Sequence, residues 1–476
     1  MINPPCPVTS SARVRVCCRL GLAGALLGAC GADPIVVGAL QEVASLPATP
    51  NRDLDLLFVI DNSPSMADNQ IALARSFPHM IDRLDQLDGG RPNLHIGVVT
   101  SDMGTQGSAS AIPGPAIGTI GLGGCSGLGQ DGVLQHGQDP ALTDPYLSDV
   151  AIATGRAQNY TGTLADEFAR LAQVGNGGCG FEQHLAAMRR ALVNPANAGF
   201  LRPEANLAVV IVGDEDDCSA RDPALMAETS DVLGPLASFR CFAQGVVCDG
   251  DAPGTPGDKH NCKPRDASAY VEPVQPFVDA LLAAKPDPRQ IMVAAVVGNP
   301  APVQVELASD PPGTPPSPTL APSCTYPAAS GPATADPAVR IAALLDGFAG
   351  RSQLTSICSP ELSGPLDAIG ATAKQLMGDP CIDTRNLADT SPAPGIQPAC
   401  EVTQDNQPGD PSGLGREAAA VTQLAPCEAG GADACYALVA DPVACPDTAD
   451  HLRVRVTHAG DDAADRWTHV RCQLAP

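Results

Sequence analysis

Four short apolar runs, separated by helical patterns, constrain the fold of this chain more than any other feature. The runs lie at 55–60, 94–100, 207–212 and 291–297. Continuous apolar runs of this length are typical of parallel strands that are buried on both faces. Between them, apolar residues recur at helical spacing, for example from Leu73 to Leu87. Strands that alternate with helices predict an α/β fold, a doubly wound and mostly parallel sheet with right-handed crossovers.

Three segments between these elements are longer than ordinary connections. They lie near 103–146, 218–270 and 300–335, and we expect them to form long loop insertions in an α/β domain that spans 53–378. From 379 to 476 the chain holds six cysteines with many Pro and Asp residues. This composition predicts a small cysteine-rich C-terminal module, mostly β or irregular, that is stapled by disulfides.

The first thirty residues have the parts of a secretory signal. Three arginines come first, at positions 13, 15 and 19, and the apolar run 20–29 follows. Ten apolar residues cannot span a bilayer, which needs about 20. The run ends at Cys30, and no apolar stretch beyond it is long enough to cross a membrane. The segment therefore predicts export rather than a transmembrane anchor.

Leu27-Gly28-Ala29-Cys30 resembles a bacterial lipobox, in which the cysteine is lipidated and becomes the mature N-terminus. The resemblance implies a signal peptide at 1–29, lipidation of Cys30 and a tether at 30–52. Gly31 rather than Asp follows the cysteine, which implies a lipoprotein of the outer membrane, on its periplasmic or its surface-exposed side. An ordinary cleaved signal is the alternative.

The net charge of −25 excludes some classes of partner. Nucleic acid and anionic lipid headgroups bind clustered Lys and Arg, and the chain has only four lysines. We therefore expect no nucleic-acid partner, and contact with the membrane through the lipid anchor only. Divalent cations suit such a surface, although the acidity could also serve solubility alone.

Fourteen of the eighteen cysteines follow position 124, an even number. None of them forms a pair of CxxC knuckles, which argues against a zinc ribbon. An oxidising compartment with up to seven disulfides is the simplest explanation.

Two acidic residues directly follow predicted strands, Asp61 and Asp214. In a doubly wound sheet, ligands bind outside the carboxyl ends of the strands. In Asp61-x-Ser63-x-Ser65, alternate residues can turn three oxygens to one point, and Mg²⁺ and Ca²⁺ take oxygen ligands. The pattern indicates a metal site, although Asp and Ser are also ordinary helix-capping residues.

The stretch 56–66, Leu-Leu-Phe-Val-Ile-Asp-Asn-Ser-Pro-Ser-Met, resembles the metal-ion-dependent adhesion site (MIDAS) that opens a von Willebrand factor A (VWA) domain. The resemblance covers roughly 53–378 and makes the expected fold VWA-like, a relative of the Rossmann arrangement. It implies that Asp61, Ser63 and Ser65 hold Mg²⁺ or Ca²⁺ together with a Thr and a further Asp from two other loops. Asp214 matches that further Asp.

The expected Thr is missing, because Cys179 occupies its place in a Gly-rich loop. Water, Asp102 or Asp216 would then complete the coordination; a degenerate site that binds no metal is the alternative. The run 214–217 holds four adjacent acids, which suits a second Ca²⁺ or a solvated turn. We expect a disulfide between Cys125 and Cys179, since both lie in Gly-rich loops expected near the site.

The resemblance implies a cell-envelope lipoprotein for cell adhesion or other protein binding, in which an acidic residue of the protein ligand completes the metal site. We expect no enzyme, because the sequence contains no GxSxG elbow, no phosphate loop and no HxxxH pair. A metal-dependent hydrolase that uses Asp61 and Asp214 is the enzymatic alternative. A structural envelope scaffold with a degenerate or purely structural metal site is the third reading.

Overall fold

The computed structural model describes residues 40–475 apart from several short gaps. These gaps are 48–50, 88–89, 137–141, 143, 230, 251, 310–312, 314, 392–394, 406–420, 428–433, 443–444, 446–447 and 458–465. The chain divides into two units, Met1–Gly38 and Ala39–Pro476, and the described residues all belong to the second. The predicted signal peptide and Cys30 therefore lie outside the described residues.

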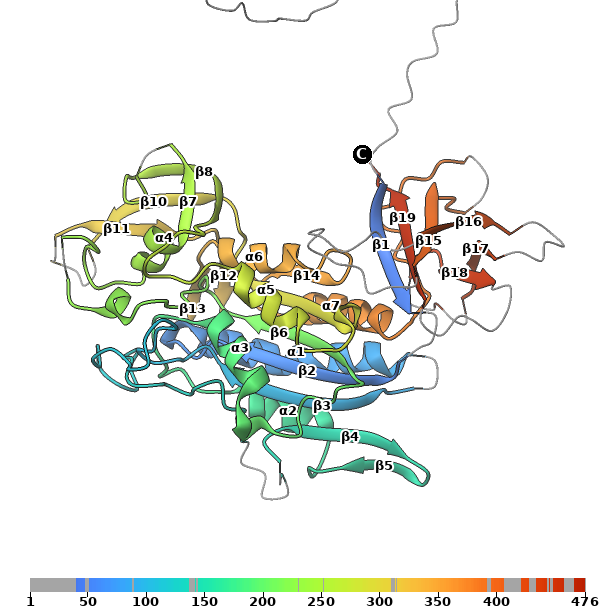
Figure 1. The fold of residues 1–476 in the computed structure, drawn as a ribbon, viewed down its shortest axis with the longest axis horizontal. Helices are drawn as coiled ribbons and strands as arrows, with labels where there is room; N and C mark the ends of the chain where they lie inside the picture. Colours follow the sequence, from blue (N-terminus) through green and yellow to red (C-terminus); the bar gives the residue numbers. More distant parts are fainter. Residues whose placement is uncertain are drawn as a thin grey trace, which may run out of the picture. The chain divides into compact units, whose positions relative to one another are not determined.

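A seven-stranded sheet forms the centre of the fold, with the order β14-β9-β6-β2-β3-β4-β5 (Figure 1). Its strands are β2 (Asp53–Ile60), β3 (Asn93–Thr100), β4 (Leu147–Ile152), β5 (Gly155–Gln158), β6 (Asn206–Val212), β9 (Ile291–Val297) and β14 (Ser352–Ser356). The five strands from β14 to β3 run parallel, whereas β4 and β5 add an antiparallel edge. The four predicted strands are β2, β3, β6 and β9, and they form the middle of this sheet.

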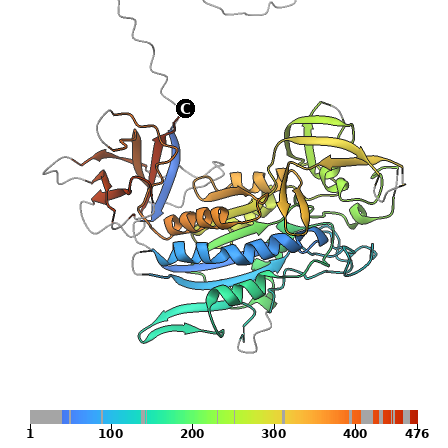
Figure 2. The same ribbon diagram turned by 180° about the vertical axis from the view of Figure 1, so that it is seen from behind.

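Helices cover both faces of the sheet. One face packs against α1 (Ala67–Asp85), α2 (Leu164–Ala172) and α7 (Ser363–Leu376), and the other against α3 (His184–Val193), α5 (Gln275–Leu282) and α6 (Val339–Asp346). Helices α1 and α7 lie side by side, as seen from behind in Figure 2. The chain is thus a mixed α/β protein, as predicted, with its core on both sides of one mostly parallel sheet.

Successive side chains of β2 point to opposite faces of the sheet, and both faces are covered by helices. Phe58 points to the α1 side, where its ring lies 6.1 Å from that of Phe77 and 4.7 Å from that of Phe168. Leu57 belongs to the core on the α3 side. A strand with helices on both faces is mostly apolar, as residues 56–60 of β2 are, whereas the buried acid Asp55 is neutralised by ion pairs.

The three predicted insertions are not all loops. Residues 103–136 are irregular, with one bridge between Ile117 and Cys125. The other two contain helix α4 (Phe239–Gly245) and two small antiparallel sheets. The first sheet has the order β11-β10-β8-β7 and consists of β7 (Val246–Asp249), β8 (Gly257–Pro264), β10 (Val303–Ala308) and β11 (Ser317–Ala321). The second pairs β12 (Cys324–Ala328) with β13 (Gly331–Ala335). The last two insertions are therefore small β structures that polar, Pro-rich sequence did not reveal.

The C-terminal module is a second sheet, with the order β1-β19-β15-β16-β17-β18 (Figure 1). Its strands are β1 (Leu40–Pro47), β15 (Cys400–Asp405), β16 (Thr422–Pro426), β17 (Cys435–Ala440), β18 (Leu452–Thr457) and β19 (Trp467–Gln473). Strand β1 comes from the segment predicted as a tether, so the 30–52 interpretation is wrong for residues 40–47. These residues pair antiparallel with β19, which completes the sheet at an edge.

All fourteen cysteines from Cys125 onward are paired, as the even count suggested. The pairs are Cys125–Cys179, Cys218–Cys241, Cys248–Cys262, Cys324–Cys358, Cys381–Cys445, Cys400–Cys472 and Cys427–Cys435. Three of them lie in the C-terminal module and the others tie down the insertions. Among the described helices, none has both the length and the apolar character that a bilayer span requires.

Candidate metal site

Three parallel strands bring the candidate residues to one edge of the sheet. Ile60 at the end of β2 pairs with Thr100 on one side and with Val212 on the other. The N–H of Asp61 donates to the carbonyl of Val212 at 2.9 Å, and the N–H of Ser101 donates to that of Ile60 at 3.1 Å. The residues that follow β2, β3 and β6 therefore meet, as the carboxyl ends of parallel strands do.

The loop after β2 folds around the carboxylate of Asp61. Its Oδ1 accepts the N–H of Ser63 at 2.7 Å and the hydroxyl of Ser101 at 3.3 Å. The hydroxyls of Ser63 and Ser65 lie 3.0 Å apart. The side-chain amide of Gln70, in the first turn of α1, donates to the carbonyl of Asp61 at 3.0 Å and so holds the backbone of the loop. The DxSxS motif thus gathers one carboxylate and two hydroxyls, as its spacing predicted.

Two carboxylate oxygens in this cluster have no partner. Asp61 is 0% exposed and Asp214 is 5% exposed. Oδ2 of Asp61 and Oδ1 of Asp214 are buried, and neither finds a hydrogen-bond partner within the described residues. A buried carboxylate oxygen without a donor or a counter-charge is costly. These two oxygens require a proton or a cation.

The electrostatics agree with this requirement. Burial raises the pKa of Asp61 well above its usual value, and the charge of Asp214 raises it further. Burial also raises the pKa of Asp214 to about 7, with a contribution from Glu215, while a hydrogen bond from Ser65 acts in the opposite direction. A nearby cation favours the charged form of a carboxyl and would reverse these shifts.

The cluster opens to solvent on one side. Asp61 and Ser63 are buried, but Pro64 and Ser65 are exposed. An ion held between Asp61 and Ser65 would therefore be protected by the protein on the strand side and reachable from solvent on the loop side. The buried side of the cluster is thus formed by the ends of the strands, and its exposed side by Pro64 and Ser65.

Two further acids stand beside the cluster, and the sequence did not single them out. Glu182 is buried, and its pKa is raised well above the usual value by burial and by Glu215 and Asp61. Burial raises the pKa of Asp336 to about 8, and the charges of Glu215 and Asp214 add to it. The backbone N–H of Asp336 donates to the carbonyl of Asp214 at 2.7 Å. Asp336 comes from a distant part of the chain, whereas Glu182 follows Cys179 closely in the Gly-rich loop expected near the site, and that place was the available signal.

The acidic run 214–217 divides into two pairs with different roles. Asp214 and Glu215 belong to the cluster. Asp216 instead accepts the N–H groups of Arg340 and Ile341 in the first turn of α6 at 2.9 and 3.1 Å. Asp217 accepts the N–H of Leu185 in α3 and forms an ion pair with Arg340 at 2.9 Å. Asp216 and Asp217 therefore bind backbone N–H groups in the first turns of α6 and α3. They form neither a solvated turn nor a free pair of metal ligands.

Asp102, the other residue proposed to complete the coordination, is also engaged elsewhere. Its Oδ1 accepts the N–H of Gly104 at 2.8 Å, and its carbonyl accepts the N–H of Gln130 at 2.8 Å. Burial raises its pKa, and the backbone N–H groups of Gly104 and Cys179 lower it. Asp102 thus shapes the start of the first insertion. Neither Asp102 nor Asp216 has contacts that support a place in the coordination sphere.

Cys179, in the position of the expected Thr, forms a disulfide with Cys125, with a Cα–Cα distance of 4.5 Å. Its sulfur is therefore not a metal ligand. The hydroxyl of Ser101, a residue that the sequence did not single out, lies 3.3 Å from Oδ1 of Asp61. Its position directly after β3 was the available signal, because β3 is the neighbour of β2 in the sheet.

His184 lies behind the cluster at the start of α3. It is 0% exposed, both ring nitrogens lack a hydrogen-bond partner among the described residues, and burial lowers its pKa to about 4. A Cβ at Gly213 would stand 2.4 Å from its Nε2 and 3.4 Å from Cβ of Asp61. The ring thus fills the space under the Asp61 loop, and position 213 must be glycine to leave room for it.

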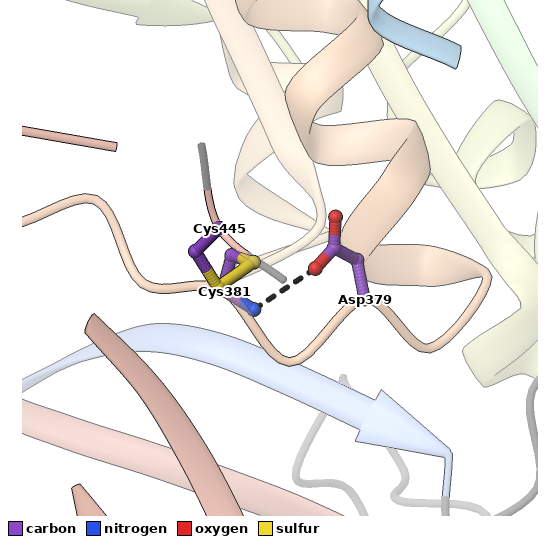
Figure 3. Close-up of side chains that lie close together, drawn as sticks. All are labelled: Asp379, Cys381 and Cys445. Atoms are coloured by element: carbon purple, nitrogen blue, oxygen red, sulfur yellow. Dashed lines mark hydrogen bonds between the residues drawn. A yellow bond between two sulfur atoms is a disulfide. The ribbon is translucent and has the colours of Figure 1, made fainter. Parts of the chain in front are cut away.

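A second group of possible ligands is Asp379, Cys381 and Cys445 (Figure 3). The two sulfurs form a disulfide, so neither is a thiolate. Asp379 forms an ion pair with Lys374 at 2.9 Å and accepts the N–H of Cys381 at 3.0 Å. Every member of this group is therefore already satisfied, and it is a structural corner of the C-terminal module.

No protein-family model matches the sequence, and no curated protein matches it either.

Proposed function

We propose that this protein is a cell-envelope lipoprotein that binds a protein ligand through a divalent cation, Mg²⁺ or Ca²⁺, held by Asp61, Ser63, Ser65 and Asp214. One observation carries the proposal: Oδ2 of Asp61 and Oδ1 of Asp214 are buried and have no hydrogen-bond partner in the described part of the chain, and two hydroxyls 3.0 Å apart lie beside them. Hard cations take such oxygen ligands.

The arrangement of the sheet supports a VWA-like, doubly wound interpretation of the α/β domain. Parallel strands with helices on both faces place ligand sites at the carboxyl ends of the strands. The candidate ligands follow β2 and β6, which are neighbours in the sheet. The DxSxS motif follows the strand and precedes α1, in the order that the VWA resemblance requires.

A bound Mg²⁺ or Ca²⁺ would supply the positive charge that the acids lack and an open coordination position. Among the described residues, Asp61 and Asp214 form no ion pair with an arginine or a lysine. Ser65 is exposed, so the open position would face solvent. A carboxylate from a protein ligand fits that position by charge. We therefore propose a role in binding.

The absent Thr weakens the likeness to a complete MIDAS and favours water as the remaining ligand.

The alternative is a structural scaffold in which the cation only stabilises the fold, and the burial of Asp61 and Glu182 favours it. Chelation of the cation would abolish ligand binding if the protein is a binding module. It would lower the thermal stability without affecting any binding if the protein is a scaffold.

A pulldown from a cell-envelope extract separates them. The bait is the mature protein in Ca²⁺ and Mg²⁺, compared with the same bait in EDTA and with Asp61→Ala. Asp346→Ala is the matched control, because Asp346 is an exposed acid at the end of α6. We expect proteins that the wild type and Asp346→Ala retain only with cation, and that Asp61→Ala does not retain. Identical capture in EDTA would contradict the proposal.

A further inference from the structure

Strand β14 is an edge of the central sheet, because β9 is the one described strand that pairs with it. In a parallel ladder, every second residue of a strand bonds to its neighbour. The carbonyl of Arg351 and the N–H of Ile357 both form hydrogen bonds with β9. The odd-numbered residues therefore face β9, and the N–H and C=O groups of Ser352 and Leu354 point away from the sheet.

Nothing in the described part of the chain pairs with this outer edge. No hydrogen bond among the described residues reaches the backbone of Ser352 or Leu354, and Leu354 is 39% exposed. The open stretch ends near Ser356, whose hydroxyl lies 3.7 Å from the sulfur of Cys324 in β12. The edge thus offers unpaired backbone donors and acceptors to a further strand.

The edge of β14 also lacks the features that prevent such pairing, which are charged residues, prolines and bulges. Its sequence, Ser-Gln-Leu-Thr-Ser, has no charge and no proline, and its register with β9 is regular. Each other edge strand of the described sheets has at least one such feature: Arg156 in β5, Arg453 in β18, Pro318 in β11, Pro327 in β12, Pro332 in β13, and an irregular register in β1 and β7. One unprotected edge among protected ones indicates a surface for binding.

The register of β14 shows where the side chains of an added strand would lie. Gln353 pairs with Ala294, in the core on the α7 side, and Leu354 pairs with Ala295, in the core on the α6 side. Residues that pair across neighbouring strands point to the same face of the sheet. A strand added at this edge would therefore place alternate side chains beside Gln353 and beside Leu354.

A cavity of about 490 Å³ lies on the Gln353 side, between α7 and part of the C-terminal module, and Gln353 lines it. Its wall is polar, with an ion pair between Arg83 and Asp367 at 2.8 Å and another between Lys374 and Asp379 at 2.9 Å. On the other face, the exposed side chain beside the edge is that of a leucine. The surroundings favour polar residues on one face of an added strand and apolar residues on the other.

We propose that the edge of β14 binds an extended segment of another protein, which joins the central sheet as a further strand. Backbone hydrogen bonds with Ser352 and Leu354 supply affinity, and alternate side chains supply specificity. The residues beside Leu354 are apolar and pack on it, whereas those beside Gln353 are polar and enter the cavity.

The charge of the molecule decides between possible occupants of this edge. A net charge of −25 on each copy disfavours pairing of two copies of this chain, and it disfavours acidic segments as well. The segment that fits is therefore one of alternating polar and apolar residues that contains few Asp and Glu. No cation takes part, so this surface is separate from the proposed cation site.

The test begins with selection from a random linear peptide library displayed on phage, against immobilised mature protein in EDTA. The chelator excludes binding through a cation. We expect enriched peptides in which polar and apolar residues alternate and which lack proline within that stretch. No enrichment, or enriched peptides without alternation, would overturn the inference.

A scan of N-methylated versions of one enriched peptide tests the backbone contacts without any change to the protein. Methylation at residues whose N–H faces β14 removes a hydrogen bond and should weaken binding at least about fivefold. Methylation at the residues between them should have little effect, because their N–H groups face away. Losses that do not alternate along the peptide would show that it does not bind as a strand.

Leu354→Pro tests the protein side, because it removes an outward N–H and no bond of the sheet, a change that edge strands tolerate. Leu354→Ala is the matched control, since it shortens the side chain but keeps the N–H. Leu354→Pro should bind the peptide at least about fivefold more weakly than Leu354→Ala, with the circular dichroism of the wild type. Equal binding by the two folded variants would contradict the inference; if Leu354→Pro does not fold, the N-methyl scan decides. A dimer of the wild type in sedimentation, absent in Leu354→Pro, would assign the edge to a second copy and also overturn it.

Discussion

The backbone N–H of Ser63 donates to Oδ1 of Asp61 at 2.7 Å, whereas Oδ2 of the same carboxylate receives no donor from the described residues. One oxygen thus orients the side chain and the other is left for a proton or an ion. Because the hydroxyl of Ser101 also reaches Oδ1, two neighbouring strands determine where Oδ2 points. The site is organised by the sheet before any ligand binds.

The first prediction concerns pH. The fold raises the pKa of Asp214 from 3.8 to about 7, so folding favours its protonated form. That stabilisation is complete below the unfolded value and is lost as the pH rises through about 7. In EDTA, Asp214→Asn should therefore gain stability relative to the wild type as the pH rises from about 4 to about 7, by at most about 4 kcal/mol in total. Urea unfolding at each pH measures the difference.

Saturating Ca²⁺ should remove this pH dependence from the wild type, since a cation favours the ionised carboxylates. The same titration of Asp346→Asn, an exposed acid, should follow the wild type in both buffers. A stability difference between Asp214→Asn and the wild type that stays constant with pH in EDTA would show that Asp214 is not held in its protonated form.

The second prediction concerns the disulfide Cys125–Cys179, which joins residues separated by 54 positions. Loop-closure entropy for that length gives a loss of about 4 kcal/mol in the free energy of unfolding when both cysteines become serine. Cation affinity should fall as well, because the Gly-rich loop loses its link to the first insertion. Removing Cys248–Cys262, in the β7–β8 hairpin, should lower stability by about 3 kcal/mol and leave cation affinity unchanged. Equal cation affinity in both double variants would refute the link to the site.

The third prediction concerns β1. It pairs with β19 from Leu40 to Pro47 and buries Ala44 and Leu46 in the core of the C-terminal module. Deleting residues 1–47 should destabilise the module by about 2–5 kcal/mol, because it removes an edge strand and its buried side chains. Deleting only residues 1–38 should leave the melting temperature unchanged. Calorimetry of the two truncated proteins compares them, and equal melting curves would rule out a structural role for β1.

The fourth prediction concerns the anchor. Mass spectrometry of the native N-terminus should find a diacyl or triacyl group on Cys30, followed by Gly31. Cys30→Ser should release the protein from the membrane fraction while its disulfides and cation affinity stay the same. A mature chain that begins elsewhere and carries no lipid would favour an ordinary cleaved signal.

The sequence predicted the centre of the fold well and its edges poorly, for a physical reason. Strands β2, β3, β6 and β9 are apolar at nearly every position because helices cover both faces. Strand β14, Ser-Gln-Leu-Thr-Ser, is an edge strand and is only partly buried, so its polar residues concealed it. The partner of β1 lies at the other end of the chain, and no local pattern reveals such a pairing.

The site shows the same division. The spacing of Asp61, Ser63 and Ser65 is local and predicted their grouping. The contributions of Glu182 and Asp336 depend on how distant loops fold back onto the sheet, and these residues were missed. Asp102 and Asp216 were plausible ligands by type, but the backbone N–H groups near them use their oxygens first.

Isothermal titration with Ca²⁺ and with Mg²⁺ tests the central claim most directly. The wild-type mature protein and Asp346→Ala should bind about one cation per chain at the candidate site. Asp61→Ala should bind none there while keeping the circular dichroism spectrum of the wild type. If the wild type binds neither ion, or if Asp61→Ala binds as tightly as the wild type, then Asp61 and Asp214 do not form a cation site and the proposed function is wrong.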